Sequence, residues 1–329
     1  MSTRRAPYGR RAVDVLGSVP PSESPPTYYE RPALKPSDWR WLIITYFFVG
    51  GMAGAAQVIA SIADLFGHER DRPLVSTGRY IALAGSLASP VLLIADLKTP
   101  SRWFNMLRVF RGTSPMSIGS WTLFAFGGFS ALAAGCQLTA DVAGVRWART
   151  LARVCGVPAA LSGALLATYT GVLLSATSTP LWATAYKLLP ALFGASGTAT
   201  ATAMMSLVLS RSASPRASMH RLERLALVAS AIELLLTLRV DRLWKDEHVA
   251  APLDESPLVV PYRFGVLGLG ILAPLGVHVL QLVTGRELRA VSTVASVAAL
   301  VGGYIQRAVI IFAGEQSAER PRDYFGITQ

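Results

Sequence analysis

The protein contains 329 residues, of which 52% are hydrophobic and only 16% are charged, and its mean hydropathy is +0.41. Soluble globular proteins carry about 25% charged residues, so this composition excludes an ordinary soluble enzyme. An outer-membrane barrel is also excluded, because the apolar residues form long runs and do not alternate at every second position. The formal net charge of +11 is typical of basic loops in a polytopic membrane protein, and we expect no nucleic-acid partner.

The sequence begins with a polar segment over residues 1–39 that is rich in Pro, Ser and Arg. This segment lacks the apolar stretch of a signal peptide, so we expect a flexible or partner-bound tail. A membrane domain is predicted over residues 40–314, followed by a short C-terminal tail over residues 315–329.

Eight apolar segments follow the N-terminal tail, each close to the ~20 residues that an α-helix needs to cross a bilayer. They cover residues 41–64, 79–97, 118–138, 154–176, 187–210, 222–240, 262–284 and 289–313. The sequence therefore predicts an all-α integral membrane protein, a bundle of eight transmembrane helices with both termini on one face. We call that face A and the opposite face B. The distribution of basic residues leaves open which face is cytoplasmic.

Polar and ionisable side chains inside the apolar segments are the candidate functional residues, because such groups are costly to place in a membrane. The alternating chain direction assigns a depth to each of them. Asp96, Tyr169 and Arg307 fall towards face A and are predicted to share one layer. A second set is interpreted as a proton route that continues towards face B, and it comprises Gln57, Asp64, Glu233 and His278.

The layer near face A suits a small polar headgroup on an apolar chain, as in a quinone. Quinol oxidation releases protons, so its site needs hydrogen-bond donors to the carbonyl oxygens and a proton acceptor. Tyr169 can donate, Asp96 can accept a proton, and Arg307 can keep Asp96 ionised. Structural roles also suit the same residues: a salt bridge between Asp96 and Arg307, a packed tyrosine, and a Glu233 carboxyl bonded to a neighbouring helix.

Cysteine and histidine are too few for most redox centres. The only cysteines are Cys136 and Cys155, whereas an iron–sulfur cluster needs four thiolates, so the chain alone cannot hold one. Two buried free thiols are expected in preference to a disulfide. His278 is the one histidine inside an apolar segment, which argues against a di-haem site. We expect no haem, no cluster and no other metal.

The segment between the second and third apolar stretches contains two prolines and four basic residues, Lys98, Arg102, Arg108 and Arg111. It could cover the face-A site, dock an acidic partner, or rest on lipid headgroups as an interfacial helix.

Several separated motifs together resemble the NrfD/polysulfide reductase family of membrane subunits. They occur in the order found in that family and span about residues 40–315. The motifs are VGGMAG at 49–54, DLKTPSR at 96–102, SPMSIGSW at 114–121, YTGVLL at 169–174, TPLW at 179–182, and a final helix with Gly302-Gly303, Arg307 and Ala313-Gly314.

The resemblance implies a quinone-binding subunit of the bacterial cytoplasmic membrane that has no redox centre of its own. It would exchange electrons between menaquinone or ubiquinone and a ferredoxin-like iron–sulfur subunit, which relays them to a molybdopterin catalytic subunit, with or without proton translocation. Tyr169 matches the quinone-site tyrosine of the family, and Asp96 falls where the family has an acidic residue. The matching motifs add three candidate quinone contacts, namely Arg102, Ser117 and Trp121.

The first helix departs from the family pattern, because residues 42–46 read LIITY and contain neither the Asn nor the His that some members present to the quinone. Two alternatives to a quinone-binding subunit stay open. A transporter would use Asp96, Glu233 and Arg307 as ligands, and the purified protein would be active without a redox partner. A passive anchor would only tether a soluble redox enzyme to membrane lipid.

Overall fold

The computed structural model describes residues 34, 37–211, 216–285, 289–320 and 323. Most of the predicted N-terminal tail therefore lies outside the described residues, as do residues 321–322 and 324–329 of the predicted C-terminal tail. Helices and their connections make up the described residues, and no strand occurs among them. The prediction of an all-α fold is confirmed.

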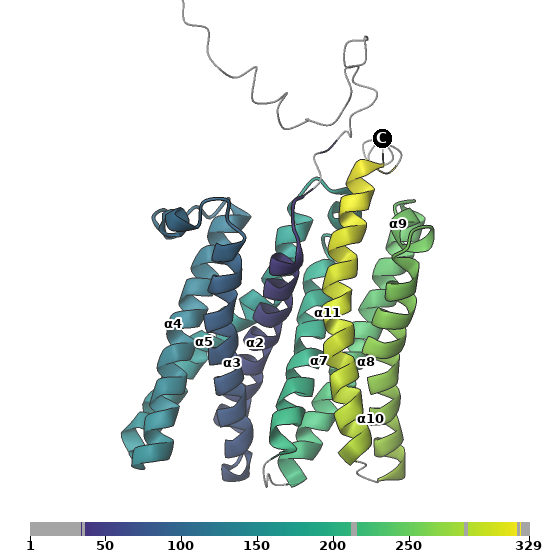
Figure 1. Cartoon of the computed structure of the whole chain (residues 1–329). Helices are drawn as coiled ribbons and strands as arrows, with labels where there is room; N and C mark the ends of the chain where they lie inside the picture. Colours follow the sequence, from purple (N-terminus) through teal and green to yellow (C-terminus); the bar gives the residue numbers. More distant parts are fainter. Residues whose placement is uncertain (1–33, 35–36, 212–215, 286–288, 321–322, 324–329) are drawn as a thin grey trace, which may run out of the picture.

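Eight long helical segments run roughly parallel to one another within the described residues (Figure 1). They are α2 (Trp41–Phe66), α3 (Arg72–Ala95), α4 (Pro115–Ala143), α5 (Arg146–Ser175), α7 (Leu189–Leu209), α8 (Arg216–Asp246), the continuous pair η4 (Pro261–Leu272) and α10 (Ala273–Thr284), and α11 (Arg289–Glu319). Short helices form parts of the connections: η2 (Glu69–Asp71), η3 (Pro100–Leu107), α6 (Pro180–Thr184) and α9 (Ala251–Asp254).

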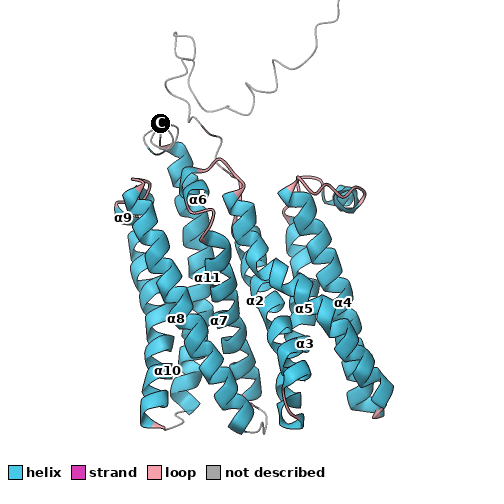
Figure 2. Cartoon of the chain, turned by 180° about the vertical axis from the view of Figure 1, so that it is seen from behind, coloured by secondary structure: helices cyan, strands magenta, loops and turns pink. Residues whose placement is uncertain are grey.

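Face A of the bundle holds the start of α2 and the end of α11, at the top of Figure 1. A hydrogen bond of 3.1 Å from Ser37 Oγ to Glu315 Oε1 joins the two ends. Seven of the long segments are long and apolar enough to cross a membrane. The remaining one, α8, runs alongside them (Figure 2) but carries charged residues over much of its length, so its crossing stays a prediction.

Several helices extend beyond the apolar segments that predicted them. The helix α3 begins at Arg72 and not at residue 79, with Pro73 in its first turn. Proline is favoured there because its fixed backbone angle suits the start of a helix. The earlier start places Arg79 two turns inside the helix, where it is 1% exposed. Near the C-terminus, α11 continues to Glu319, beyond the predicted domain boundary at residue 314.

Glycines allow the helices to approach closely, as is common where small residues line helix contacts in membranes. A Cβ atom on Gly54 of α2 would overlap the backbone carbonyl of Gly163 on α5. Between α11 and η4, a Cβ atom on Gly302 would likewise overlap the backbone of Gly270. Cys136 and Cys155 are free thiols, as expected, but both are only partly buried.

Candidate functional site

The most deeply buried charged group of the final helix is the guanidinium of Arg307 on α11, which is 1% exposed. Its Nη1 atom donates to Ser196 Oγ on α7 and, at 2.7 Å, to Gln306 Oε1. Longer bonds of 3.3 Å reach the backbone carbonyls of Gly303 and Phe193. The guanidinium also lies over the Phe193 ring, 5.0 Å from its centroid, which is a favourable cation–π geometry.

Glu233 on α8 belongs to the same group of side chains and is connected with Arg307 through Gln306. Gln306 donates from Nε2 to Glu233 Oε1 at 3.2 Å while its own Oε1 accepts from Arg307. Glu233 is 4% exposed and Gln306 is 2% exposed. We call Ser196, Glu233, Gln306 and Arg307 the Arg307 cluster. It joins α7, α8 and α11 inside the bundle.

Tyr169 lies on α5 towards face A and is 4% exposed. Its hydroxyl donates to the backbone carbonyl of Pro115, in the first turn of α4, at 2.5 Å. The phenol ring covers Gly119, where any Cβ atom would overlap it. Pro115 and Gly119 of α4 therefore fix the position of the Tyr169 side chain.

Two further buried residues with hydroxyl groups, Tyr46 and Ser89, lie beside Gly50 of α2. Tyr46 of α2 is 3% exposed, interacts electrostatically with Tyr169, and makes no hydrogen bond through its hydroxyl within the described residues. Ser89 of α3 is fully buried, and its Oγ has no partner there. The Tyr46 ring and Ser89 Oγ both lie beside Gly50. We call Tyr46, Ser89 and Tyr169 the tyrosine site.

Aromatic rings connect the tyrosine site with the Arg307 cluster. The rings of Tyr46 and Phe47 are 5.7 Å apart, and those of Phe47 and Phe193 are 6.4 Å apart in an edge arrangement. Phe193 in turn supports the Arg307 guanidinium. A Cβ atom on Gly51 would lie 3.8 Å from Arg307 Nη2, so Arg307 is adjacent to α2 about one turn from Tyr46.

Asp96 directly follows α3 at face A, seven residues or about two turns beyond Ser89. Its carboxylate is half-buried, and burial raises the pKa of this group above its ordinary value. The bonds of Arg307 go to the Arg307 cluster and to backbone carbonyls. The predicted pairing of Arg307 with Asp96 is therefore not found in the described residues, because Arg307 turns towards α7 and α8.

The three candidate contacts from the sequence motifs lie around the connection between α3 and α4. Arg102 is exposed on η3. The hydroxyl of Ser117 accepts from the Arg111 amide at 3.0 Å and so ties the connection to α4. Trp121 packs edge-on against Phe110 at 6.2 Å between centroids, and its buried Nε1 has no partner among the described residues.

A second buried arginine, Arg79 of α3, organises the face-B half of the bundle. Its Nη2 atom forms an ion pair of 2.8 Å with Asp64 Oδ2 on α2, and its Nη1 atom donates to Gln137 Oε1 on α4 at 2.5 Å. Asp64 is also paired, at 3.2 Å, with the half-exposed Arg153 of α5. We call Asp64, Arg79, Gln137 and Arg153 the Arg79 cluster.

The remaining predicted proton-route residues fall into separate places. Gln57, which is fully buried, donates to Ser61 Oγ at 3.1 Å, one turn from Asp64 on α2. His278 lies on α10 beside a polar cavity of about 200 Å³ near face B, which Gln281 and Arg224 also line. The structure thus associates Gln57 with Asp64, and Glu233 with Arg307, while His278 is apart from both.

Sequence reasoning does not find several residues of these groups. Hydropathy alone places Arg79 at the first residue of a span, although Arg72-Pro73 signals an earlier helix start. Tyr46 and Ser89 stand inside apolar stretches and have no distinguishing spacing. Ser196 is one of several small polar residues on its helix, and only the three-dimensional contact with Arg307 distinguishes it.

The helical bundle with buried charged and polar groups inside apolar helices defines a multi-pass membrane protein with a polar interior. More specifically, the chain belongs to the NrfD family, since the family model described as "Polysulphide reductase, NrfD" matches residues 33–318. A polysulfide reductase subunit of Wolinella succinogenes is 30% identical over 91 residues, which are 27% of this protein and 29% of that relative. The resemblance seen in the sequence motifs is confirmed. No group of three or more potential metal-ligating side chains occurs in the parts of the protein that the structure describes.

Proposed function

We propose that this protein is the quinone-binding membrane subunit of a multi-subunit oxidoreductase. The observation that carries the proposal is the tyrosine site, where the buried Ser89 Oγ has no partner in the described residues and two buried tyrosines, Tyr46 and Tyr169, interact electrostatically. Buried polar groups are normally hydrogen-bonded, so unpartnered ones indicate a missing ligand or ordered water. The carbonyl oxygens of a quinone are suitable acceptors for these hydroxyls.

The roles of the residues follow from their chemistry. Tyr46 and Tyr169 would hydrogen-bond the headgroup, with Tyr169 exchanging its bond to the Pro115 carbonyl for one to the ligand. Ser89 would add a further contact from α3. Asp96, at the edge of face A, would receive a proton released on quinol oxidation and pass it to water.

Electrons must leave this subunit, because its two cysteines cannot hold an iron–sulfur cluster. A ferredoxin-like iron–sulfur subunit docked on face A would receive them and relay them to a molybdopterin catalytic subunit. The basic connection containing η3, with Arg102 exposed, is suitably placed on the same face. The assembly would lie in the bacterial cytoplasmic membrane and connect the menaquinone or ubiquinone pool with the respiratory chain.

A proton route through the protein would use the Arg307 cluster. Glu233 can gain and lose a proton, and Gln306 connects it with Arg307 through hydrogen bonds. The guanidinium stabilises negative charge in its vicinity. Asp64 is paired with two arginines, so we assign it to the packing of the helices and not to this route.

The test is quinol-linked turnover of the purified complex carrying Tyr46→Phe or Tyr169→Phe. Loss of a hydrogen bond that strengthens in the transition state should lower turnover by about tenfold for each variant, equivalent to ~1.4 kcal/mol. Tyr186→Phe is the matched control, because Tyr186 is 54% exposed and its hydroxyl makes no hydrogen bond within the described residues. Unchanged turnover in both test variants would contradict the proposal and favour a passive anchor.

A further inference from the structure

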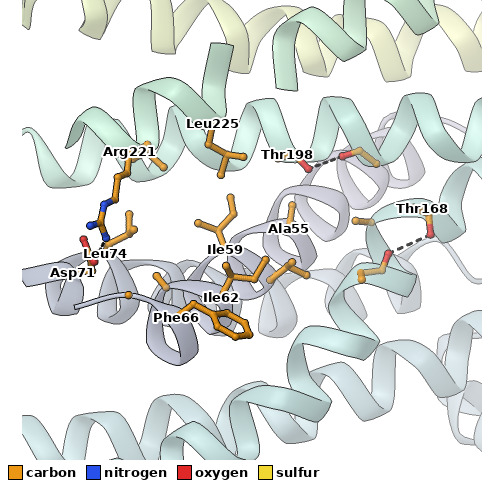
Figure 3. A pocket seen from close by; sticks show the side chains of 17 residues that line it. Ala55, Ile59, Ile62, Phe66, Asp71, Leu74, Thr168, Thr198, Arg221 and Leu225 are labelled. Atoms are coloured by element: carbon orange, nitrogen blue, oxygen red, sulfur yellow. Dashed lines mark hydrogen bonds and ion pairs between the residues drawn. The ribbon is translucent and has the colours of Figure 1, made fainter. Parts of the chain in front are cut away.

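A large apolar groove lies on the face-B side of the bundle, away from the tyrosine site. It has a volume of about 500 Å³ and is formed by α2, α5, α7 and α8, with the start of α3 near its mouth. Figure 3 shows Ala55, Ile59, Ile62 and Phe66 of α2 along the groove. Ile62 and Phe66 are exposed where the groove opens, whereas Ala55 and Ile59 are buried deeper inside.

The inner end of the groove offers no free hydrogen-bond donor among the described side chains. The hydroxyl of Thr168 donates to backbone carbonyls of its own helix, at 3.2 Å to Ala164 and 3.1 Å to Leu165. The hydroxyl of Thr198 donates to the Gly194 carbonyl at 2.8 Å. These two threonines lie at the end of the groove opposite the ion pair in Figure 3. The interior therefore suits a hydrocarbon chain and provides nothing to a polar headgroup.

The mouth of the groove is charged. Asp71 is 2% exposed and accepts from the His68 amide at 2.9 Å, from Ser218 Oγ at 2.9 Å and from Arg221 Nη1 at 2.5 Å. Arg221 itself is half-exposed, and within the described residues Asp71 is the acceptor found for it. The remaining N–H groups of this guanidinium are available to a phosphate oxygen, for which arginine is well suited.

We propose that the groove is a binding site for a membrane phospholipid, with one acyl chain between α2, α5, α7 and α8 and the phosphate on Arg221. The polarity of the groove matches that of a phospholipid. The charged Arg221 lies at face B, where the phosphate would be, and the apolar groove extends from it towards the bilayer centre, where the acyl chain would be. A quinone would place its carbonyls either against saturated threonines or beside an ion pair. The site is independent of the quinone site proposed near face A.

The first test uses phosphatidylglycerol with a photoreactive diazirine in the middle of one acyl chain, mixed into vesicles that contain the full-length wild-type protein. After illumination, mass spectrometry of the peptides identifies the labelled residues. Label on Ala55 and Ile59 is expected, because both line the groove. The two residues are diagnostic, because both are buried and bulk lipid does not reach them. Label confined to exposed residues such as Phe66 would overturn the proposal without any variant having to fold.

A groove-filling variant and a matched control sharpen this test. Ala164→Phe places a ring in the groove from an exposed position on α5, and should reduce label on Ile59 several-fold. Ala131→Phe makes the same change at an exposed position on α4 outside the groove, and should leave that label unchanged. Equal labelling in the two variants would overturn the proposal.

A second measurement identifies the bound molecule through native mass spectrometry of the protein in mild detergent. One phospholipid should stay bound to the wild type and be retained several-fold less by Arg221→Gln, whose amide can still bond Asp71. Arg224→Gln, one turn along α8, should retain it. Three results would overturn the proposal. The protein retains an isoprenoid quinone in place of the phospholipid, the quinone displaces the photolabel in competition, or both arginine variants lose the phospholipid equally.

Discussion

Arg79 and Arg307 are both 1% exposed inside apolar helices, yet their surroundings differ. Arg79 forms a direct ion pair with Asp64, which also pairs with Arg153 at the edge of the bundle. Arg307 bonds neutral side chains and backbone carbonyls, and its nearest acidic partner, Glu233, is reached through Gln306. Arg79 is thus in direct contact with a carboxylate, whereas Arg307 interacts with the Glu233 carboxyl only at longer range.

The difference separates a structural role from a functional one. A buried ion pair holds its helices together, because removing one partner leaves an uncompensated charge in a low dielectric. An arginine without a directly paired carboxylate can instead respond to a charge that arises nearby during a reaction. We therefore propose that Arg79 stabilises the packing of α2, α3, α4 and α5, and that Arg307 takes part in the chemistry proposed near the tyrosine site.

Replacing each arginine with methionine tests this difference between Arg79 and Arg307 most directly. Arg79→Met leaves the Asp64 carboxylate partly buried without its inner partner, and should cost about 3–5 kcal/mol of stability. Arg307→Met leaves neutral hydrogen-bonding groups and a Glu233 carboxyl that the guanidinium does not contact directly, for which the cost is about 1–3 kcal/mol. Thermal unfolding of the purified proteins in the same detergent should give a clearly lower Tm for Arg79→Met.

The control for this pair is Arg153→Met, which removes a half-exposed partner of the same Asp64 carboxylate. Its Tm should stay near that of the wild type, because exposed ion pairs contribute little. Equal Tm values for Arg79→Met and Arg307→Met would refute the division into structural and functional arginines.

The contacts of Tyr169 with Pro115 and Gly119 can be tested by substitution at the glycine. Gly119→Ala would place a methyl group inside the Tyr169 ring, so the tyrosine must move away from the Pro115 carbonyl. Overpacking of this kind costs about 1–3 kcal/mol, and quinol turnover should fall together with the stability. Gly127→Ala on the same helix meets no atom within 4 Å and should change neither property. A normal turnover rate in Gly119→Ala would remove Tyr169 from the site.

The fold could be predicted from the sequence to a large extent, because long apolar runs give a strong signal for membrane helices. The segment 41–64 differs from α2 by only two residues at its end. Helix ends that carry charge were less predictable. The start of α3 was missed because Arg72 and Arg79 interrupt the apolar pattern, so hydropathy placed the boundary at the second arginine.

The candidate site could be predicted only in part, because hydropathy indicates the depth of a residue but not the direction in which it faces. Depth alone predicts Arg307 beside Asp96, whereas the rotation of α11 turns it towards Ser196 and Gln306. Tyr46 was missed because a tyrosine in an apolar run is ordinarily a packing residue. Only the packing of α2 beside α5 brings it near Tyr169.

The role of the Arg307 cluster in proton transfer can be tested at Glu233. Glu233→Gln preserves the shape and leaves an acceptor for Gln306, so the Tm should change little. The substitution removes the ionisable group, and coupled proton transfer should fall while quinone binding is retained. Proton uptake by the reconstituted complex measures the first effect, and quinone titration the second. Glu315→Gln, near face A, is the control; proton uptake at the wild-type rate in Glu233→Gln would exclude the route through Glu233.

The smallest expected effect is at Asp96, which contrasts with both clusters because it is only half-buried and stands at the face-A edge. As a proton acceptor it works only when ionised, so turnover should fall as the pH drops through its pKa. Since burial raises this pKa, the acid limb of the pH profile should lie above the range of an ordinary aspartate, whose pKa is about 3.9. Asp96→Asn should abolish that limb with a modest loss of rate, because water at this edge can take the proton. Asp246→Asn, an exposed aspartate at face A, should leave the profile unchanged; an acid limb that persists in Asp96→Asn would assign the titration to another group.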